Sequence, residues 1–261
     1  MKLGTLQGVL NEPLETVFNT AAEIGFDGVE LDWRDLAEAE PGGPLAPERR
    51  AALRRAAEEA GVEIASVAAH FLNRGGIASA GEAQQQFGLS AVRGGITLCR
   101  DLGADLLLVP FFGEATLQDQ AAIERLVANL KKLAAEAEAA QITLAIEHTL
   151  PAGQTADLLN KVGAPYIGNY WDMGNCMSMG YEPLAEIRAL GPHMSRVHAK
   201  EYDQKVNTKP LGQGQVPLRE IILTLRQIDY NGYIILETGH FNDPRASAQQ
   251  ALAALQKALD D

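Results

Sequence analysis

The stretch YIGNYWDMGN, Tyr166 to Asn175, is a short apolar run that ends in a carboxylate, Asp172, and then turns through a glycine. Three other segments have the same construction, with a polar residue where the apolar run stops. Those polar residues are Glu147 in ITLAIEH, His198 in MSRVHAK and Glu237 in GYIILET. Apolar runs of this length are typical of buried strands. The four segments therefore predict four strands that each end in a potential metal ligand.

The whole chain repeats a strand followed by a helix. Eight apolar runs alternate with about eight helical patterns, and 261 residues divided by eight give about 33 residues per unit. The expected strands are residues 2–9, 27–33, 62–70, 105–112, 141–148, 166–172, 194–200 and 232–238. Several are apolar along their length, as parallel strands covered on both faces are. This alternation predicts an α/β fold, a (β/α)8 TIM barrel that forms a single domain over residues 1–261.

A doubly wound open sheet is the competing architecture. Such a sheet often carries a glycine-rich turn, G-x-G-x-x-G, after its first strand. The candidate segment here, LQGVLNEP from Leu6, lacks that pattern. Its absence favours the barrel.

The helical patterns begin and end at recognisable residues. Asn11 is the expected N-cap of the first helix, and Thr155 is the expected cap of a short helix after residue 151. The other expected helices lie at about 47–60, 82–102, 117–140, 182–191, 217–230 and 246–259. Residues 34–47, which include PGGP at 41–44, are predicted to form a loop.

Composition limits the classes of function. The formal net charge of -12 opposes binding to a phosphate backbone, which requires clustered Lys and Arg. We therefore expect a small-molecule partner and no nucleic acid. Two cysteines favour a reducing, cytoplasmic location over a disulfide framework. We expect no signal peptide, because the N-terminal MKLGTLQGVLNEP lacks a long apolar run. We expect no membrane span, because no apolar run approaches the roughly 18 residues that a span requires.

The four strand-end residues can converge on one ion. In a barrel the carboxyl ends of the strands form one face, where active sites lie, and neighbouring strands are about 5 Å apart. Three carboxylates and one imidazole suit Mn²⁺, Mg²⁺, Co²⁺ or Zn²⁺. The carboxylates give the site a charge of about -3, which a divalent ion offsets. Any one of the four alone could be an ordinary polar residue, but four at successive strand ends favour a joint site.

The motifs IEHT at Ile146, WDMGN at Trp171, VHAKE at Val197 with LGQG downstream, and ILETG at Ile235 carry a family resemblance. The chain resembles the sugar phosphate isomerase/epimerase family of the xylose-isomerase-like TIM barrel superfamily. The resemblance implies one divalent metal, Mn²⁺ first among the candidates. The implied ligands are Glu147, Asp172, His198 and Glu237. It also implies that the two glutamates exchange a proton beside a carbonyl of a carbohydrate substrate.

The chemistry of such a site is consistent with that implication. A metal that binds a ketose carbonyl and the neighbouring hydroxyl acidifies the C–H between them and stabilises the cis-enediolate that forms. Return of the proton to the opposite face is epimerisation, and return to the neighbouring carbon is aldose–ketose isomerisation. The sequence does not choose between them. The alternative is a lyase that dehydrates a keto-polyol such as an inosose or a dehydroshikimate-like ring. A related DNA-repair endonuclease is disfavoured by five histidines in all and by the acidic charge.

Three further residues are expected to bind substrate. His70 ends the third strand, and Lys200 follows His198 by two residues and so faces the same side. A structural hydrogen bond for His70 and a salt bridge for Lys200, to Glu201 or another acid, are the alternatives. Asn175 stands where many relatives carry a histidine, so this chain departs from the family at a substrate contact.

Other polar residues are expected around the mouth of the barrel. Arg74, Lys205 and Lys209 are candidate phosphate ligands, although whether the substrate is phosphorylated stays open. Glu30 is expected to face the barrel interior, and His240 to line the mouth. Trp33, Phe71, Phe111 and Phe112 are candidates for an apolar wall against a sugar. The oligomeric state is not readable from the sequence, which is compatible with a homo-oligomer.

Overall fold

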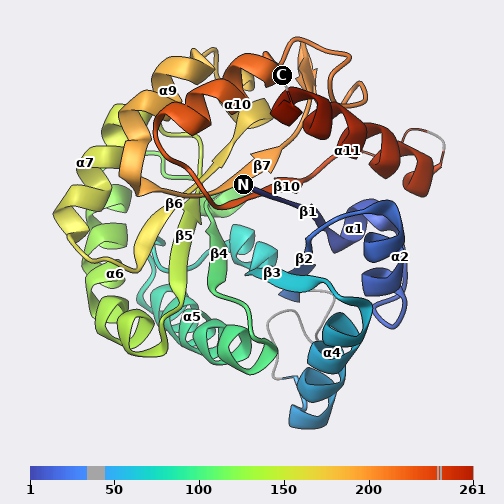
Figure 1. Ribbon diagram of the computed structural model, residues 1–261. Coiled ribbons are helices and arrows are strands. Elements are labelled where there is room, and N and C mark those ends of the chain that lie inside the picture. The colour runs from blue at the N-terminus through green and yellow to red at the C-terminus, as the bar shows by residue number, and fades with distance from the viewer. Residues whose placement is uncertain (34–44, 240, 242, 261) are drawn as a thin grey trace.

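A computed structural model of the protein describes residues 1–33, 45–239, 241 and 243–260. Most of the expected 34–47 loop, with its PGGP segment, and His240 lie outside the described residues. Eight parallel strands close into a barrel in the order β1-β10-β7-β6-β5-β4-β3-β2, and helices surround it (Figure 1). The strands are β1 Lys2–Leu6, β2 Gly28–Asp32, β3 Glu63–Ala68, β4 Leu106–Pro110, β5 Thr143–Glu147, β6 Ile167–Asp172, β7 Met194–Ala199 and β10 Tyr233–Leu236. The predicted (β/α)8 barrel is confirmed, and each of the eight expected strands is present.

The larger helices cover the outside of the barrel. They are α2 Val17–Ile24, α4 Pro47–Ala60, α5 Glu82–Leu102, α6 Gln120–Ala140, α7 Ala152–Val162, α9 Pro183–Leu190, α10 Leu218–Gln227 and α11 Pro244–Asp260. Short elements complete the fold: α1 Gln7–Leu10, η1 His70–Arg74, η2 Gly113–Ala115, α8 Met173–Ser178, η3 Gly191–His193, and the two-stranded sheet of β8 Tyr202–Asp203 and β9 Lys205–Val206.

Two expected helix caps are wrong. Asn11 adopts a left-handed conformation, with φ of 51°, and ends α1 instead of starting the next helix. Asparagine tolerates this conformation better than most residues, which suits it to a helix end. Thr155 lies inside α7, where its hydroxyl donates to the carbonyl of Pro151 at 3.1 Å. The helix begins earlier because Pro151, in an extended conformation, occupies the N-cap position.

Side chains alternate along the strands between the barrel interior and the helical layer. On β4, Leu106 and Leu108 belong to a small inner cluster, whereas Leu107 and Val109 belong to the large core under the helices. Gly95 lies in the middle of α5, where a Cβ atom would come within 2.5 Å of the Leu107 side chain. The absence of that atom lets α5 approach β4 closely. The strands are therefore buried on both faces, as their sequences predict.

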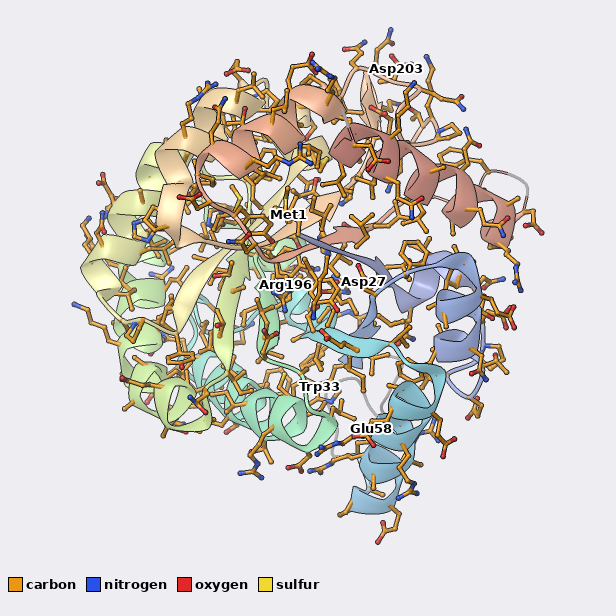
Figure 2. The ribbon with its side chains drawn as sticks, in the orientation of Figure 1. Met1, Asp27, Trp33, Glu58, Arg196 and Asp203 are labelled. Atoms are coloured by element: carbon orange, nitrogen blue, oxygen red, sulfur yellow. The ribbon has the colours of Figure 1, made fainter. Side chains whose placement is uncertain are left out.

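The amino-terminal end of the barrel is filled by side chains. Arg196 lies near the barrel centre in Figure 2, donates to the carbonyl of Ala65 at 2.7 Å and lies 5.1 Å from the centroid of the Tyr233 ring. The Tyr233 hydroxyl donates to Glu63 at 2.7 Å. Side chains thus close this end of the barrel. The polar strand ends described next lie at the opposite, carboxyl-terminal mouth.

Candidate metal centre

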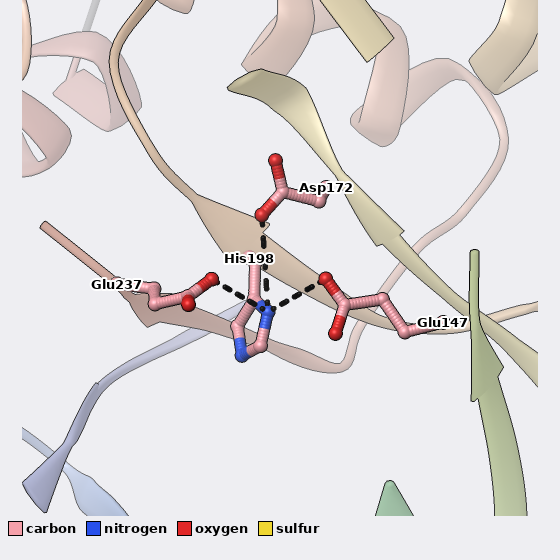
Figure 3. A group of neighbouring side chains, drawn as sticks. All are labelled: Glu147, Asp172, His198 and Glu237. Atoms are coloured by element: carbon pink, nitrogen blue, oxygen red, sulfur yellow. Dashed lines mark hydrogen bonds and ion pairs between the residues drawn. The ribbon is translucent and has the colours of Figure 1, made fainter. Parts of the chain in front are cut away.

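Four consecutive barrel strands bring the predicted ligands together. Glu147 and Asp172 are the last residues of β5 and β6, His198 is the last but one of β7, and Glu237 directly follows β10. Each side chain offers one ligand atom, and these four atoms all lie within 4.8 Å of one another. Figure 3 shows the three carboxylates arranged around the His198 ring. The convergence expected from the strand order is therefore present.

His198 lies at the centre of this cluster and is fully buried. Its Nδ1 atom is 3.2 Å from Glu237 Oε2, 3.4 Å from Glu147 Oε1 and 3.9 Å from Asp172 Oδ2. Burial lowers the pKa of His198, but the charges of the surrounding carboxylates, Glu237 foremost, outweigh burial and raise the pKa well above its usual value. Nδ1 faces the carboxylates and is the ring nitrogen placed to ligate a metal, which would take the place of the Nδ1 proton.

The other ring nitrogen of His198 is held by Glu30. Glu30 is completely buried, and its Oε1 lies 2.9 Å from His198 Nε2. Its second oxygen accepts hydrogen bonds from Ser66 at 2.6 Å and Tyr170 at 2.8 Å. Burial opposes ionisation of Glu30, but the His198 charge and these hydrogen bonds prevail and lower its pKa. A carboxylate in this position fixes the ring and directs Nδ1 towards the cluster, as in metal-bound histidines.

Lys200 pairs with two members of the cluster. Its Nζ atom lies 2.7 Å from Glu237 Oε2 and 3.1 Å from Asp172 Oδ2. Against the effect of burial, the Lys200 charge lowers the pKa of Glu237 to about 2. Burial raises the pKa of Asp172 to about 6 in spite of Lys200. The side chain passes over Gly174, where a Cβ atom would lie only 3.0 Å from Lys200 Cγ.

Asn175 borders the cluster through the helix that follows β6. Its backbone N–H donates to Asp172 Oδ1 at 2.6 Å, so Asp172 caps α8. Its side-chain amide lies 3.4 Å from Glu147 Oε1. The sequence indicated a turn through glycine here and missed this short helix, whose start fixes the orientation of the Asp172 carboxylate.

His70 lies at the edge of the cluster and pairs with Asp32, with 2.9 Å between Nδ1 and Oδ2. Burial lowers the pKa of His70, but the hydrogen bond and charge of Asp32 outweigh it and raise the pKa. Both side chains, together with Glu237, line a cleft of about 930 Å³. The structure thus places the three expected substrate-binding residues, His70, Asn175 and Lys200, around the same mouth.

Two features of the mouth were missed by sequence reasoning. Glu201 is fully buried, and its carboxylate accepts hydrogen bonds from the backbone N–H groups of Tyr202, Gly212 and Val216. It therefore holds the 202–216 loop instead of pairing with Lys200. Phe87 of α5 contacts Phe71 edge-on, with 6.3 Å between ring centroids, and is 54% exposed. Its place in a long helix gave no signal that it borders the cleft.

Of the four proposed wall residues, Phe71 lines this cleft. Trp33 is buried against Phe71, with 5.2 Å between their ring centroids. Phe111 is also buried, at 2% exposure. A packing role therefore accounts for Trp33 and Phe111.

The donor set fits a divalent cation. The described residues Asp172 and Glu237 each keep one buried oxygen without a hydrogen bond of good geometry, and both of these oxygens face the cluster. Carboxylate oxygens and one imidazole nitrogen are suitable ligands for Mn²⁺, Mg²⁺, Co²⁺ and Zn²⁺. Even with both Lys200 and His198 positively charged, the carboxylates of Glu30, Glu147, Asp172 and Glu237 leave a surplus of negative charge. These residues could hold one such ion.

A closed parallel barrel with a charged cluster at the carboxyl ends of its strands is the arrangement of a TIM-barrel enzyme. The chain belongs to the xylose isomerase-like TIM barrel family, whose model matches residues 18–258. None of the helices in the described part of the chain combines the length and apolar character needed to cross a bilayer.

Two relatives of the chain are named as epimerases. The chain is 31% identical over 214 residues to 2-epi-5-epi-valiolone 7-phosphate 2-epimerase of Actinoplanes sp.. This match covers 79% of this chain and 75% of that protein. It is 29% identical over 231 residues to L-ribulose-5-phosphate 3-epimerase UlaE of Salmonella heidelberg. This match covers 83% of this chain and 79% of that protein. Both relatives are epimerases, one of a valiolone phosphate and one of a ribulose phosphate, so the predicted family and the isomerase class of enzyme are confirmed.

Solved structures agree with the fold. The structure of D-psicose 3-epimerase in the presence of D-fructose matches with a TM-score of 0.84 and 19% identity, over all of both chains. The structure of L-ribulose 3-epimerase matches with a TM-score of 0.83 and 21% identity, over 99% of this chain and 94% of that one. At these identities the likeness concerns the barrel itself.

Proposed function

We propose that the protein is a divalent-metal-dependent epimerase that acts on a ketose or its phosphate. The observation that carries this proposal is the convergence of Glu147, Asp172, His198 and Glu237, with four ligand atoms within 4.8 Å at the mouth of the barrel. The epimerase relatives support the same reaction class. Mn²⁺ is the first candidate for the metal, with Mg²⁺, Co²⁺ and Zn²⁺ as alternatives.

The same four residues would hold the metal. When bound, the ion supplies Lewis-acid polarisation of the substrate carbonyl and positive charge for the oxygens that gain electrons. Glu30 would keep the remaining ring proton of His198 on Nε2, 2.9 Å from its carboxylate, when a metal takes the place of the Nδ1 proton. Lys200 compensates part of the carboxylate charge and keeps Glu237 ionised, which is the form that accepts a proton.

Glu147 and Glu237 are the proposed proton carriers. They approach the His198 ring from different sides, β5 and the end of β10 (Figure 3). One carboxylate removes the proton from the carbon beside the carbonyl, and that C–H bond breaks. The other, in its protonated form, donates to the opposite face of the same carbon, where a new C–H bond forms. The net result is inversion at one carbon with no change in oxidation state.

Solvent deuterium uptake tests this proposal. We expect a ketose or ketose phosphate from a panel to gain one deuterium at the epimerised carbon in D2O, and only when Mn²⁺ is added to chelator-treated protein. Glu147→Gln and Glu237→Gln should each lower the rate by about 10²–10⁴-fold. Glu220→Gln, which changes an exposed glutamate on α10, is the matched control. Exchange that survives chelation, or that survives both substitutions, would contradict the proposal.

A metal-dependent dehydratase of a keto-polyol is the second candidate, and the His70–Asp32 pair is the observation that favours it. A lyase requires an acid that protonates the departing hydroxyl. Asp32 raises the pKa of His70, which favours the charged imidazolium, and His70 lines the same cleft as Glu237. An enone absorbance with inosose-like substrates, lost in His70→Gln, would identify this activity.

A further inference from the structure

The cleft beside the metal cluster extends well beyond the reacting groups. It is lined by Glu237 of the cluster and by the His70–Asp32 pair, and also by Phe71, Phe87 and Arg74, which are not members of the cluster. Its volume of about 930 Å³ is at the upper end of the range, roughly 300–1,000 Å³, of clefts that enclose drug-sized ligands. A free pentose or hexose would leave much of this space to water. The substrate therefore has room for a substituent that reaches away from the metal.

Arg74 supplies a positive charge to the lining of that cleft. Its side chain is exposed, and within the described residues its guanidinium forms no hydrogen bond or ion pair. The two other cations expected near the mouth differ from it, since neither is among the residues that line the cleft. Lys209 is already paired with Asp203 at 2.7 Å, and Lys205 is exposed on β9.

The turn that carries Arg74 is firmly held. η1 begins at His70 and ends at Arg74, so one turn presents both side chains to the cleft. Leu72 in its middle is 1% exposed, and the side chain of Asn73 accepts a hydrogen bond from the backbone N–H of Phe112 at 3.1 Å. Arg74 is thus a cation on a fixed base, at the end of the same turn that pairs His70 with Asp32.

We propose that Arg74 binds a phosphate on the substrate, so that the protein acts on a sugar phosphate. This inference rests on the proposed epimerase function and specifies its substrate class. A guanidinium binds phosphate oxygens through two parallel hydrogen bonds, a geometry that lysine cannot reproduce. The carboxylates of the metal cluster repel a phosphate, so the charged end of the substrate lies at Arg74 and the carbonyl end lies at the cluster. Phe71 and Phe87, which line the same cleft, offer apolar surface to the C–H groups of the substrate.

The test compares one ketose in three forms: free, phosphorylated at its terminal carbon, and oxidised there to a carboxylate. We expect the wild-type kcat/KM to rank phosphate first. In Arg74→Gln the ratio of kcat/KM for the phosphorylated over the free form should fall about 10- to 100-fold, mainly through KM. Arg188→Gln removes an exposed arginine of α9 that is not among the cleft residues, and should leave the ratio unchanged. Arg74→Lys should restore only part of it.

An equal preference for the free form, a preference for the carboxylate, or an unchanged ratio in Arg74→Gln would overturn the proposal. A second measurement separates it from the epimerase function. Calorimetric binding of the ketose phosphate to metal-loaded protein requires no turnover. If no ketose is turned over, but binding is lost in Arg74→Gln, the phosphate site stands and the epimerase function fails. Equal binding by wild type and Arg74→Gln, or absent binding by wild type, refutes the phosphate site.

Discussion

Replacing Glu30 by glutamine tests how the barrel orients its proposed metal ligand. Glu30 accepts from His198 Nε2 at 2.9 Å, from Ser66 at 2.6 Å and from Tyr170 at 2.8 Å, all without solvent exposure. Glutamine keeps one acceptor oxygen and gains an N–H2 group. If the oxygen stays with the two hydroxyls, the amide N–H2 faces Nε2. His198 must then move its proton to Nδ1, the atom that faces the other carboxylates.

That change should weaken metal binding without removing a ligand. Loss of an outer carboxylate partner typically costs 10- to 100-fold in metal affinity, which is about 1.4–2.7 kcal/mol. The lost negative charge acts in the same direction, because Glu30 belongs to a cluster with a surplus of carboxylates. We therefore expect the Kd for Mn²⁺ to rise about 10- to 100-fold in Glu30→Gln.

The affinity can be measured by competition with a fluorescent metal indicator, with far-UV circular dichroism as the check on folding. Ser66→Ala is the matched control, since it removes a hydrogen bond from the same carboxylate and leaves the pairing with His198 intact. It should lower stability by about 1–3 kcal/mol and change the metal Kd much less. A wild-type Kd in Glu30→Gln, or an equal loss in Ser66→Ala, would show that Glu30 does not set the tautomer of His198.

Two further outcomes follow from local packing. Gly174→Ala places a Cβ atom 3.0 Å from Lys200 Cγ, so we expect the free energy of unfolding in denaturant to fall by about 1–3 kcal/mol. Gly153→Ala, the control, has open space at its Cβ position and should be neutral or stabilising. Equal effects of the two substitutions would contradict the contact. Cys99 and Cys176 are both buried, and burial raises the pKa of each thiol, to about 12 for Cys176. A thiol reagent at neutral pH should therefore label neither cysteine in the native protein and both after unfolding. Rapid labelling of the native protein would contradict this burial.

The barrel was predictable because parallel strands buried on both faces are written as short apolar runs. Each expected strand is present, and the helices 47–60 and 82–102 have the predicted bounds. Caps were less predictable, since Asn11 suits a helix start and a left-handed helix end equally well by residue type. The chain decides between them through Pro13, whose carbonyl accepts from Thr16 and Val17 and delays the next helix.

The candidate ligands could be predicted from the sequence because each lies at the end of its own strand. The residues that hydrogen-bond to them or pair with them could not. Glu30 and His198 are 168 positions apart and meet only because the barrel closes. The partners of Lys200 also come from other strands, Asp172 from β6 and Glu237 from the end of β10. The sequence alone suggested the adjacent Glu201 as a salt-bridge partner. Glu201 faces away instead and binds the backbone of the following loop. Contacts of this kind depend on strand order and register, which a single sequence does not display.

The arrangement of charge links the two proposals. The metal cluster contains more carboxylates than positively charged side chains, so it attracts a divalent ion and repels an anionic substrate group. Lys200 is committed to Asp172 and Glu237, which leaves it poorly placed to bind a distant phosphate. Arg74 lines the cleft and is unpaired within the described residues, so its guanidinium is available to a phosphate. A substrate with a neutral carbonyl end and an anionic far end can enter this mouth in one orientation, which presents its reacting carbon to Glu147 and Glu237.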